Sequence, residues 1–554
     1  MKKITNLVFL IVIIVSAYLP FMNFRVLRMA GDEKVYISQA IEMARDGRWF
    51  VQTLADEPNY FKGPLHYILI RIGMIFFGNN LFSALWMNLL FVLICGITMF
   101  QLGARRWGEK SGLILGFAAA LNVGLYSHSY VSQMEIELTA FYCLAAWILS
   151  IGEYKSSWSV KQFNKHNFKW DLLFWVLAGI SGWSKSPLYS VFIGISGITY
   201  WALTGQLMIR ARSYKSWLAA ITGVLIGFAG YLPVYLLDKE HFVAFYLYRE
   251  NISKPNTNRP WHYVMIPLTY FLFPWTFIVL SGIIEAVKKK FRDTDTLFLG
   301  LAIAIPSILF WCFWSYKGQN YNLPNMIGLV IAALALHNGE PPKWVFSVTG
   351  VIGLIASMAF VYVMIHFWPL PSWWDPFWVA LALVSLFSFS FLFLKTTKLD
   401  LETVKHLGIG AMLFFVAFAA IIVPTGQREM IDARKFIKEH PGVTYHYYNL
   451  DPSIWSEWGI LELTLKEKMI GLHRKEQLEE ATKPGHVIFV MQDEWVNNVL
   501  DFAKTHKRSA PEIYTWKRWL TKGRLPDGTS RWSSAWYGRD LTQLERDFKI
   551  LYFK

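Results

Sequence analysis

The chain has 554 residues, of which 54% are hydrophobic and 17% aromatic, and only 17% carry a charge, against roughly 25% in soluble proteins. This composition excludes a single soluble globular domain and indicates a membrane protein with several spans. A formal net charge of +15 would also suit a nucleic-acid-binding protein. The basic residues instead form short clusters between apolar segments, where membrane topology places them, so we expect no nucleic-acid partner.

Apolar windows along the chain predict about thirteen transmembrane helices. The predicted ranges are 5–24, 81–101, 111–126, 136–151, 171–183, 187–204, 217–237, 263–287, 297–314, 320–337, 344–367, 376–394 and 407–424. The first range follows Lys2 and Lys3 and lacks an Ala-x-Ala type cleavage site, so we interpret it as an uncleaved span. The three cysteines, Cys95, Cys143 and Cys312, lie in apolar runs and are expected to be buried hydrophobic residues.

Lysine and arginine clusters fall in alternate loops, which the positive-inside rule places in the cytoplasm. The segment Leu65 to Phe77 is apolar but short and carries Arg71; a span there would move Arg105 and Arg106 outside, so we predict an interfacial helix. The predicted outside segments are 25–80, 127–135, 184–187, 238–262, 315–319, 368–375 and everything after about residue 424.

The composition changes after residue 424. Residues 425–554 are charged throughout, with strand-like runs at 443–449 and 487–491 and helix-compatible stretches such as 463–478. We therefore predict two domains: a transmembrane domain over 1–424, whose first outside loop is 25–80, and a soluble extracytoplasmic α/β domain over 425–554. The aromatic and basic stretch Tyr514 to Trp519 could bind an acceptor, although packing is the simpler interpretation.

Two carboxylate pairs lie at predicted outside ends of spans. Asp32 and Glu33 follow the first span, where a general base could meet a lipid-borne substrate, although a solvated acidic turn is the simpler alternative. Glu135 and Glu137 open another span, where they could also act as electrostatic helix caps.

Several outside segments hold cations where the positive-inside rule prefers none. These are Lys62, Lys185, Arg249, Lys254 and Lys317. A single cation of this kind could bind a lipid headgroup. As a set, with carboxylates nearby and no His/Cys cluster, they indicate acid–base chemistry on a phosphate-bearing substrate at the outer leaflet.

The outside segments together resemble those of the lipid A 4-amino-4-deoxy-L-arabinose transferases and the wider protein O-mannosyltransferase-like family of GT-C glycosyltransferases. Asp32-Glu33-Lys34-x-Tyr36 resembles the family's Asp-Glu-x-x-Tyr opening, and Tyr60-Phe61-Lys62-Gly63-Pro64-Leu65 resembles its Phe-Glu-Lys-Pro-Pro-Leu motif. Phe61 replaces a Glu and Gly63 replaces a Pro, which bears on the sugar specificity more than on the reaction class. Further matches are Trp183 to Pro187, Glu250 to Lys254, Trp261 to Trp275 and Ser315 to Pro324.

The resemblance implies a GT-C fold of thirteen spans with a soluble outside C-terminal domain. It implies that Asp32 is the catalytic carboxylate, with Glu33 and Glu135 positioning the sugar or the lysines. It also implies a role at the donor phosphate for several residues, namely Lys62, Lys185, Arg249, Lys254, Lys317 and Tyr321.

We therefore expect an inverting glycosyltransferase of the bacterial inner membrane, with its active site on the periplasmic side. The donor would be a polyprenyl-phosphate sugar (aminoarabinose, mannose or similar), and the acceptor lipid A, protein or another envelope glycan. No cofactor or metal is required, although the Asp32–Glu33 pair could bind a divalent cation. The alternative function is a flippase for lipid-linked sugars, which should instead place ionisable residues near the bilayer midplane.

Overall fold

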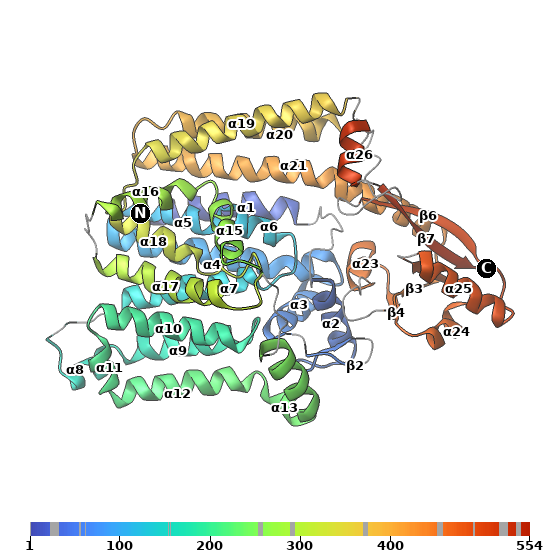
Figure 1. Ribbon diagram of the computed structural model, residues 1–554, viewed down its shortest axis with the longest axis horizontal. Coiled ribbons are helices and arrows are strands. Elements are labelled where there is room, and N and C mark those ends of the chain that lie inside the picture. The colour runs from blue at the N-terminus through green and yellow to red at the C-terminus, as the bar shows by residue number, and fades with distance from the viewer. Residues whose placement is uncertain are drawn as a thin grey trace.

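The computed structural model consists of a large helical bundle with a five-stranded sheet at one end (Figure 1). It describes residues 2–22, 33–54, 57–60, 62–152, 155, 157–252, 259–288, 294–368, 370, 375–450, 458–490, 493–519, 530–538 and 545–554. Asp32 and Lys254 lie outside these residues, as does the side chain of Arg249.

Each predicted span contains helical structure. The long helices of the bundle are α1 (Lys2–Tyr18), α4 (Leu81–Trp107), α5 (Glu109–Ala120), α7 (Glu135–Ile151), α9 (Phe168–Ser181), α10 (Pro187–Leu203), α12 (Tyr214–Ala229), α15 (His262–Phe271), α16 (Thr276–Val287), α17 (Thr294–Phe313), α18 (Met326–Leu336), α19 (Trp344–His366), α20 (Pro376–Leu394) and α21 (Leu401–Glu439). Among the described residues, α4, α17, α19, α20 and Leu401–Ile421 of α21 are long and apolar enough to cross a membrane by length and composition. The pair α15 and α16 meets the same criterion jointly, with a bend of 115° between them.

The structure corrects several predicted boundaries. The window 111–126 ends at Ala120 and a second helix, α6 (Val123–Ser129), follows, because Asn122 caps α6 by accepting a hydrogen bond from the Leu125 N–H at 2.9 Å. The window 263–287 is likewise divided between α15 and α16. The predicted domain boundary at residue 424 falls inside the continuous helix α21.

The two breaks, one after α5 and one after α15, face each other. The Val123 N–H donates to the Phe273 carbonyl at 2.9 Å, and the Trp275 indole N–H donates to the Leu121 carbonyl at 2.6 Å. Non-helical backbone at membrane depth has to be satisfied by other protein groups. Each break therefore supplies hydrogen-bond partners that the other needs.

The first predicted outside loop is compact and largely buried. It contains α2 (Glu33–Arg45), a short antiparallel hairpin of β1 (Thr53–Leu54) and β2 (Glu57–Pro58), and α3 (Leu65–Phe77), which is the helix predicted for that segment. Eleven residues of α2 are buried, which is typical of a helix held between other elements. In Figure 1, α2 lies between the bundle and the helix α23 (Trp458–Leu465).

The C-terminal residues form a mixed sheet. Its order is β4-β3-β5-β7-β6, comprising β3 (Thr444–Tyr448), β4 (Met469–Leu472), β5 (His486–Val490), β6 (Glu512–Trp519) and β7 (Glu545–Phe553). β3 runs parallel to β4 and β5, and β7 runs antiparallel to β5 and β6. The short helices η3 (Lys475–Gln477) and α24 (Leu478–Ala481) and the helix α25 (Asp493–Thr505) accompany the sheet, whereas α26 (Arg531–Gly538) packs against the end of α19.

The two strand-like runs in the C-terminal region are confirmed as β3 and β5. The helix-compatible stretch 463–478 is wrong in part, because β4 lies inside it. Trp516 on β6 is fully buried against Phe489 and Phe548, so this residue of the aromatic stretch packs in the sheet, as the simpler interpretation held.

Segments predicted to lie on the inside of the membrane and segments predicted to lie on its outside are found at opposite ends of the bundle. The chain start and the short helices α8 (Val160–His166) and α11 (Leu207–Ala211), which belong to basic loops, lie at the left in Figure 1. The helices α2, α3 and α13 (Leu232–Leu237) and the sheet lie at the right. The predicted inside and outside segments are thus separated in space.

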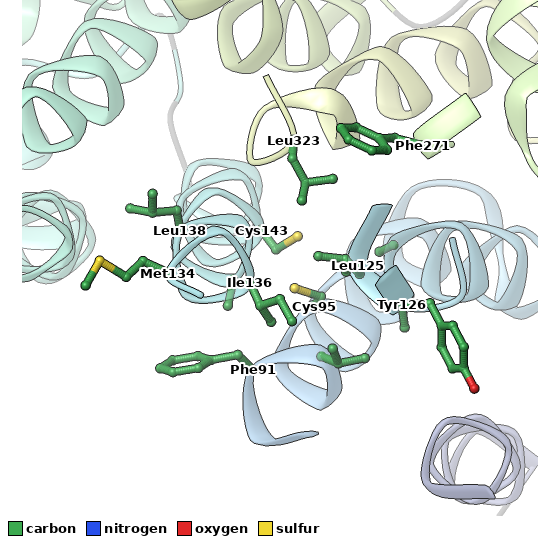
Figure 2. Close-up of a cluster of buried hydrophobic side chains, with 14 of the residues drawn as sticks. Phe91, Cys95, Leu125, Tyr126, Met134, Ile136, Leu138, Cys143, Phe271 and Leu323 are labelled. Carbon is green, nitrogen blue, oxygen red and sulfur yellow. The ribbon is translucent and has the colours of Figure 1, made fainter. Parts of the chain in front are cut away.

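Apolar side chains at the start of α7 pack in the core of the bundle. Figure 2 shows Met134, Ile136 and Leu138 of this region beside Phe91 and Cys95 of α4. Cys95 and Cys143 are buried, and Cys312 is partly buried. This packing fixes α7 and therefore the position of the carboxylates that alternate with its apolar residues.

Candidate functional site

Glu33 is held at the start of α2 by a backbone donor. Its side chain is fully buried, and the Ser132 N–H donates to its carboxylate, so α2 is joined to the turn that precedes α7. Asp32, the residue directly before it, lies outside the described residues. This hydrogen bond therefore fixes the position of Glu33, the second residue of the predicted carboxylate pair.

The segment that carries Lys62 passes tightly over the turn between α9 and α10. The Leu65 N–H donates to the Trp183 carbonyl at 2.9 Å. A Cβ on Gly63 would overlap the same carbonyl oxygen and lie 2.9 Å from the Tyr231 hydroxyl oxygen, so only glycine fits there. Lys62 itself is only 7% exposed.

Three predicted site residues meet in one cluster. The Lys185 ammonium donates to Glu135 Oε1 at 2.5 Å, and its nitrogen lies 5.0 Å from the centroid of the Tyr321 ring. The Asn320 amide donates to the same carboxylate oxygen. The side chain of Glu135 is 4% exposed and that of Lys185 is 15% exposed. The cluster joins α7, the turn before α10 and the loop before α18.

Lys317 lies in the same loop as Asn320 and Tyr321. Its ammonium donates to the Trp314 carbonyl at 2.5 Å, and Arg259 donates to the Lys317 carbonyl at 2.9 Å. Tyr321 stacks at a tilt on Trp311 with ring centroids 4.4 Å apart. The loop is therefore stiffened by aromatic contacts and presents cations at the same end of the bundle.

The structure adds residues that the sequence reasoning did not select. His66 of α3 is fully buried and pairs through Nδ1 with Glu137. His66 Nε2 lies 3.0 Å from Ser132 Oγ, and Ser184 Oγ donates to Glu137 Oε2 at 2.6 Å. The only local sign in the sequence is that His66 is a polar residue four positions after Lys62, at the start of a mainly apolar segment that also contains Arg71.

The hydroxyl of Tyr60 ties the Lys62 segment to the helices that follow α12. It donates to Asp238 Oδ2 at 3.2 Å, at the end of α13. Burial, and next the Asp238 carboxylate, raise the pKa of Tyr60 to about 12. The hydroxyl therefore keeps its proton, and the hydrogen bond, at physiological pH.

An apolar groove of about 620 Å³ runs along α9, α10 and α12. Gly179, Gly194 and Gly223 form part of its floor, and the groove continues to η2 (Phe242–Ile252). At one end, Tyr246 donates to Tyr231 at 2.8 Å, and Tyr231 donates to the Gly182 carbonyl, beside the turn that carries Lys185. The groove thus leads from the apolar bundle surface to the charged cluster.

Within the part of the chain that the structure describes, no group of three or more His, Cys, Asp or Glu residues is arranged to hold a metal ion. The carboxylates of the cluster instead contact an ammonium, an imidazole, amides and hydroxyls. Their arrangement suits recognition of an anionic substrate by the lysines that they orient.

Taken together, the described residues form a largely helical bundle with an apolar groove and a lysine–carboxylate cluster at one end. Residues 57–234 match the family described as dolichyl-phosphate-mannose-protein mannosyltransferase. The chain is also similar to the undecaprenyl phosphate-α-4-amino-4-deoxy-L-arabinose arabinosyl transferases of Pseudomonas fluorescens (22% identity, 61% of each chain) and Wigglesworthia glossinidia brevipalpis (22% identity, 66% of this chain and 65% of the relative).

A further relative is an uncharacterized protein of Aquifex aeolicus, 20% identical over 47% of this chain and 50% of its own. These sequence matches span 50% to 65% of the relatives' own lengths. The crystal structure of ArnT from Cupriavidus metallidurans bound to undecaprenyl phosphate superposes with a TM-score of 0.70 at 14% identity, over 98% of this chain and 97% of that one. The structure of the same protein in the apo state gives a TM-score of 0.66 over 88% and 93%.

The chain therefore has the GT-C fold, and the predicted helical membrane architecture is confirmed at that level. In sequence, the chain is similar to the ArnT and protein O-mannosyltransferase type, as the resemblance indicated.

Proposed function

We propose that this protein transfers a sugar from a polyprenyl-phosphate carrier to an acceptor on the extracytoplasmic side of the bacterial inner membrane. The observation that carries the proposal is the cluster of Lys185, Glu135, Asn320 and Tyr321 at the end of an apolar groove. A polyprenyl phosphate combines an apolar tail with an anionic head and matches both features. The ArnT structure with a similar fold is bound to undecaprenyl phosphate.

The groove would take part of the carrier's apolar tail. Large apolar side chains along it are half or more exposed, among them Val191 (53%), Val224 (54%) and Phe228 (71%). A carrier tail that already lies in lipid gains close packing in the groove rather than the free energy of removing apolar area from water. The groove would therefore align the tail, and the cations would orient the phosphate.

The reaction follows from the charges. The acceptor hydroxyl attacks the anomeric carbon, the bond from this carbon to the phosphate oxygen breaks, and the hydroxyl proton goes to Asp32. The singly charged phosphodiester becomes a phosphomonoester with additional negative charge. Cations beside this oxygen stabilise the transition state, a contribution of about 3 kcal/mol for one donor in a preorganised site.

Each predicted site residue has a role in this reaction. Asp32 is the base and the displacement inverts the anomeric carbon, while Glu33 and Glu135 position their partners. The residues proposed at the donor phosphate are Lys62, Lys185, Arg249, Lys254, Lys317 and Tyr321. The lysines neutralise the phosphate, so the proposal needs no metal or other cofactor.

The proposal also includes the number of membrane spans and the segments that lie in the periplasm. We expect thirteen spans in residues 1–424, with the 25–80 loop and residues 425–554 in the periplasm. The sugar would be aminoarabinose, mannose or a similar sugar. The acceptor would be lipid A, as in the arabinosyl transferases that the chain resembles, with protein or another envelope glycan as the alternatives.

Asp32→Asn tests the reaction. The full chain in proteoliposomes would receive radiolabelled undecaprenyl-phosphate 4-amino-4-deoxy-L-arabinose and lipid A. We expect labelled acceptor and free undecaprenyl phosphate from the wild-type protein. The variant should lose transfer by about 10³-fold or more, because it lacks the proton acceptor, while undecaprenyl phosphate still binds.

Asp46→Asn is the matched control, since Asp46 lies in the same loop, 36% exposed and 3.7 Å from Arg48. It should retain activity within about twofold. Turnover by Asp32→Asn would refute the assigned base. Movement of intact donor across the bilayer without cleavage would refute the transferase and indicate a flippase.

Lipid A mass spectra with and without the gene then identify the acceptor: an unchanged spectrum excludes lipid A.

A further inference from the structure

A second cluster of polar side chains lies behind the proposed site and is fully buried. It contains His66, Glu137, Ser132 and Ser184, each with no exposed surface. His66 Nδ1 pairs with Glu137 Oε1, Ser184 Oγ donates to Glu137 Oε2 at 2.6 Å, and His66 Nε2 lies 3.0 Å from Ser132 Oγ. Because these groups have no access to solvent, they have no access to the substrate either.

The hydrogen bonds around His66 indicate a proton on its Nδ1. Ser132 Oγ carries one proton and lies within reach of both His66 Nε2 and the Ala84 carbonyl, at 3.0 and 3.2 Å. Whichever of these accepts that proton, His66 Nδ1–H donates to the Glu137 carboxylate. Both oxygens of Glu137 then have a donor, as a buried carboxylate requires.

Each member of this cluster is adjacent in sequence to a segment of the proposed site. His66 follows Lys62 by four residues, and Ser184 directly precedes Lys185. Ser132 donates through its backbone to Glu33, and Glu137 lies two residues after Glu135 on α7. Four segments that are distant in the chain are thus joined at one point behind the reacting groups.

We infer that His66 and Glu137 are a positioning pair that sets the spacing between the carboxylates and the lysines of the transferase site. The inference rests on the proposed function. The pair touches neither donor nor acceptor; it holds α3, α7 and the Ser184 turn in one register. Catalytic groups displaced by about 1 Å lose on the order of 10² in rate. Binding of the carrier tail in the apolar groove should change little, because neither His66 nor Glu137 lines that groove.

The test compares variants of His66 under the transfer assay described above, with undecaprenyl-phosphate 4-amino-4-deoxy-L-arabinose as the probe. His66→Ala removes both hydrogen bonds, and we expect kcat to fall about 100-fold while the donor KM stays within about threefold. His66→Asn places an amide N–H near the position of Nδ1 and restores the bond to Glu137. We expect the kcat of His66→Asn to be at least about tenfold higher than that of His66→Ala.

Thr139→Ala is the matched control. Thr139 is buried on α7, two residues from Glu137, and its hydroxyl bonds only within the helix, to the Glu135 carbonyl at 2.7 Å. It should keep kcat within about twofold. Rates are expressed per folded protein, measured as the monodisperse fraction in size-exclusion chromatography, so that loss of folding does not count as loss of kcat.

Three outcomes would overturn the inference. A His66→Ala protein with kcat within threefold of wild type refutes any role, and a His66→Asn protein no better than His66→Ala refutes the role of the Glu137 bond. A loss expressed only in the donor KM refutes positioning for the chemical step. If the wild-type protein cleaves no donor, the proposed function fails and the inference fails with it; an active wild type with any of the other outcomes refutes the inference alone.

Discussion

Gly63 lies where the Lys62 segment crosses the turn that carries Lys185. The missing side chain lets the Trp183 carbonyl approach closely enough to accept the Leu65 N–H at 2.9 Å. The relatives described by the sequence motif have proline at this position. The glycine in this chain therefore maintains a backbone contact that joins two cation-bearing segments of the proposed site.

We predict that Gly63→Ala damages the site more than a typical surface change. The new Cβ would overlap the Trp183 carbonyl, and relief of such overpacking costs about 1–3 kcal/mol. We expect a lower thermal midpoint and at least a tenfold loss of transfer, measured on detergent-purified protein. The control is Gly152→Ala, where the nearest atom to a Cβ is the Ile148 carbonyl oxygen at 3.6 Å; equal behaviour of the two variants would contradict the prediction.

Among single residues, the sequence identifies the charged residues of the proposed site better than the buried residues that hold them in position. Glu135 and Lys185 stand out because charge at the outer end of a span is costly, Tyr321 is indicated by the family resemblance, and the three do meet. His66 does not stand out, because a single histidine in an apolar helix most often packs in a core. Its partner Glu137 is 71 residues away in the chain, and no local pattern relates the two.

The helix α2 links the first loop to the C-terminal sheet. Arg45 at its last turn forms an ion pair with Glu462 of α23, donates to the Met469 carbonyl at 3.1 Å and lies 4.9 Å from the Trp458 ring. A Cβ on Gly459 would come within 2.9 Å of Ser38 Cα, so α2 and α23 touch through their backbones. Because α2 begins one residue after Asp32, this contact bears on the proposed base.

Arg45→Ala should loosen the α2–α23 contact. It leaves the Glu462 side chain, only 5% exposed, without its guanidinium partner, at a cost of about 1–3 kcal/mol. We expect faster hydrogen exchange of amides in α2 and α23 and reduced transfer. Lys435→Ala is the control, because its ion pair with Glu439 is 4.0 Å long with both side chains more than half exposed. Unchanged exchange in α2 would show that the contact contributes nothing.

The C-terminal sheet carries a pH-sensitive pair. His446 Nε2 lies 2.8 Å from His486 Nδ1, and burial, and next the neighbouring His486, lower the pKa of His446 to about 4, despite the opposing Glu480 carboxylate. In an unfolded chain this pKa is about 6.5. The unfolded state therefore binds more protons between these two values, and stability falls as pH falls from about 6.5 toward 4.

We predict that His446→Gln flattens this dependence. Wild-type protein should lose about 3 kcal/mol of sheet stability between pH 7 and pH 4 from this residue, visible as a falling thermal midpoint. The variant should lose less, while replacement of the exposed His506, directly after α25, by Gln (His506→Gln) should leave the wild-type dependence. Equal slopes for wild type and His446→Gln would contradict the assignment to His446.

The elements themselves were predictable where one physical signal dominates. Hydropathy locates α19 and α20 almost to the residue. It merges α15 with α16, because both halves of that window are apolar and the turn at Phe273 and Pro274 leaves the mean hydropathy unchanged. The strand β4 was missed since only four residues form it, between helices, and its partner β3 comes from 20 or more residues earlier.

Across the whole molecule, the arrangement of charge agrees with the separation of the two bundle ends. The α8 and α11 loops, with Lys161 and Arg212, lie at the end that also holds the chain start (Figure 1). The sheet, α2 and α3 lie at the other end. The basic loops that contribute to the +15 net charge thus lie away from the proposed site, where Lys185 pairs with the Glu135 carboxylate.

Cysteine labelling tests which end faces the periplasm. The native Cys95 and Cys143 are buried and Cys312 is partly buried, so Cys312→Ser gives a background of low reactivity. We predict that Lys504→Cys, exposed on α25, reacts with a membrane-impermeant maleimide once the outer membrane alone is opened. Lys161→Cys, exposed on α8, should react only after the inner membrane is permeabilised. Because the proposed donor phosphate, acceptor and C-terminal sheet share one end of the bundle, the reverse labelling pattern would place the reaction in the cytoplasm and refute the extracytoplasmic proposal.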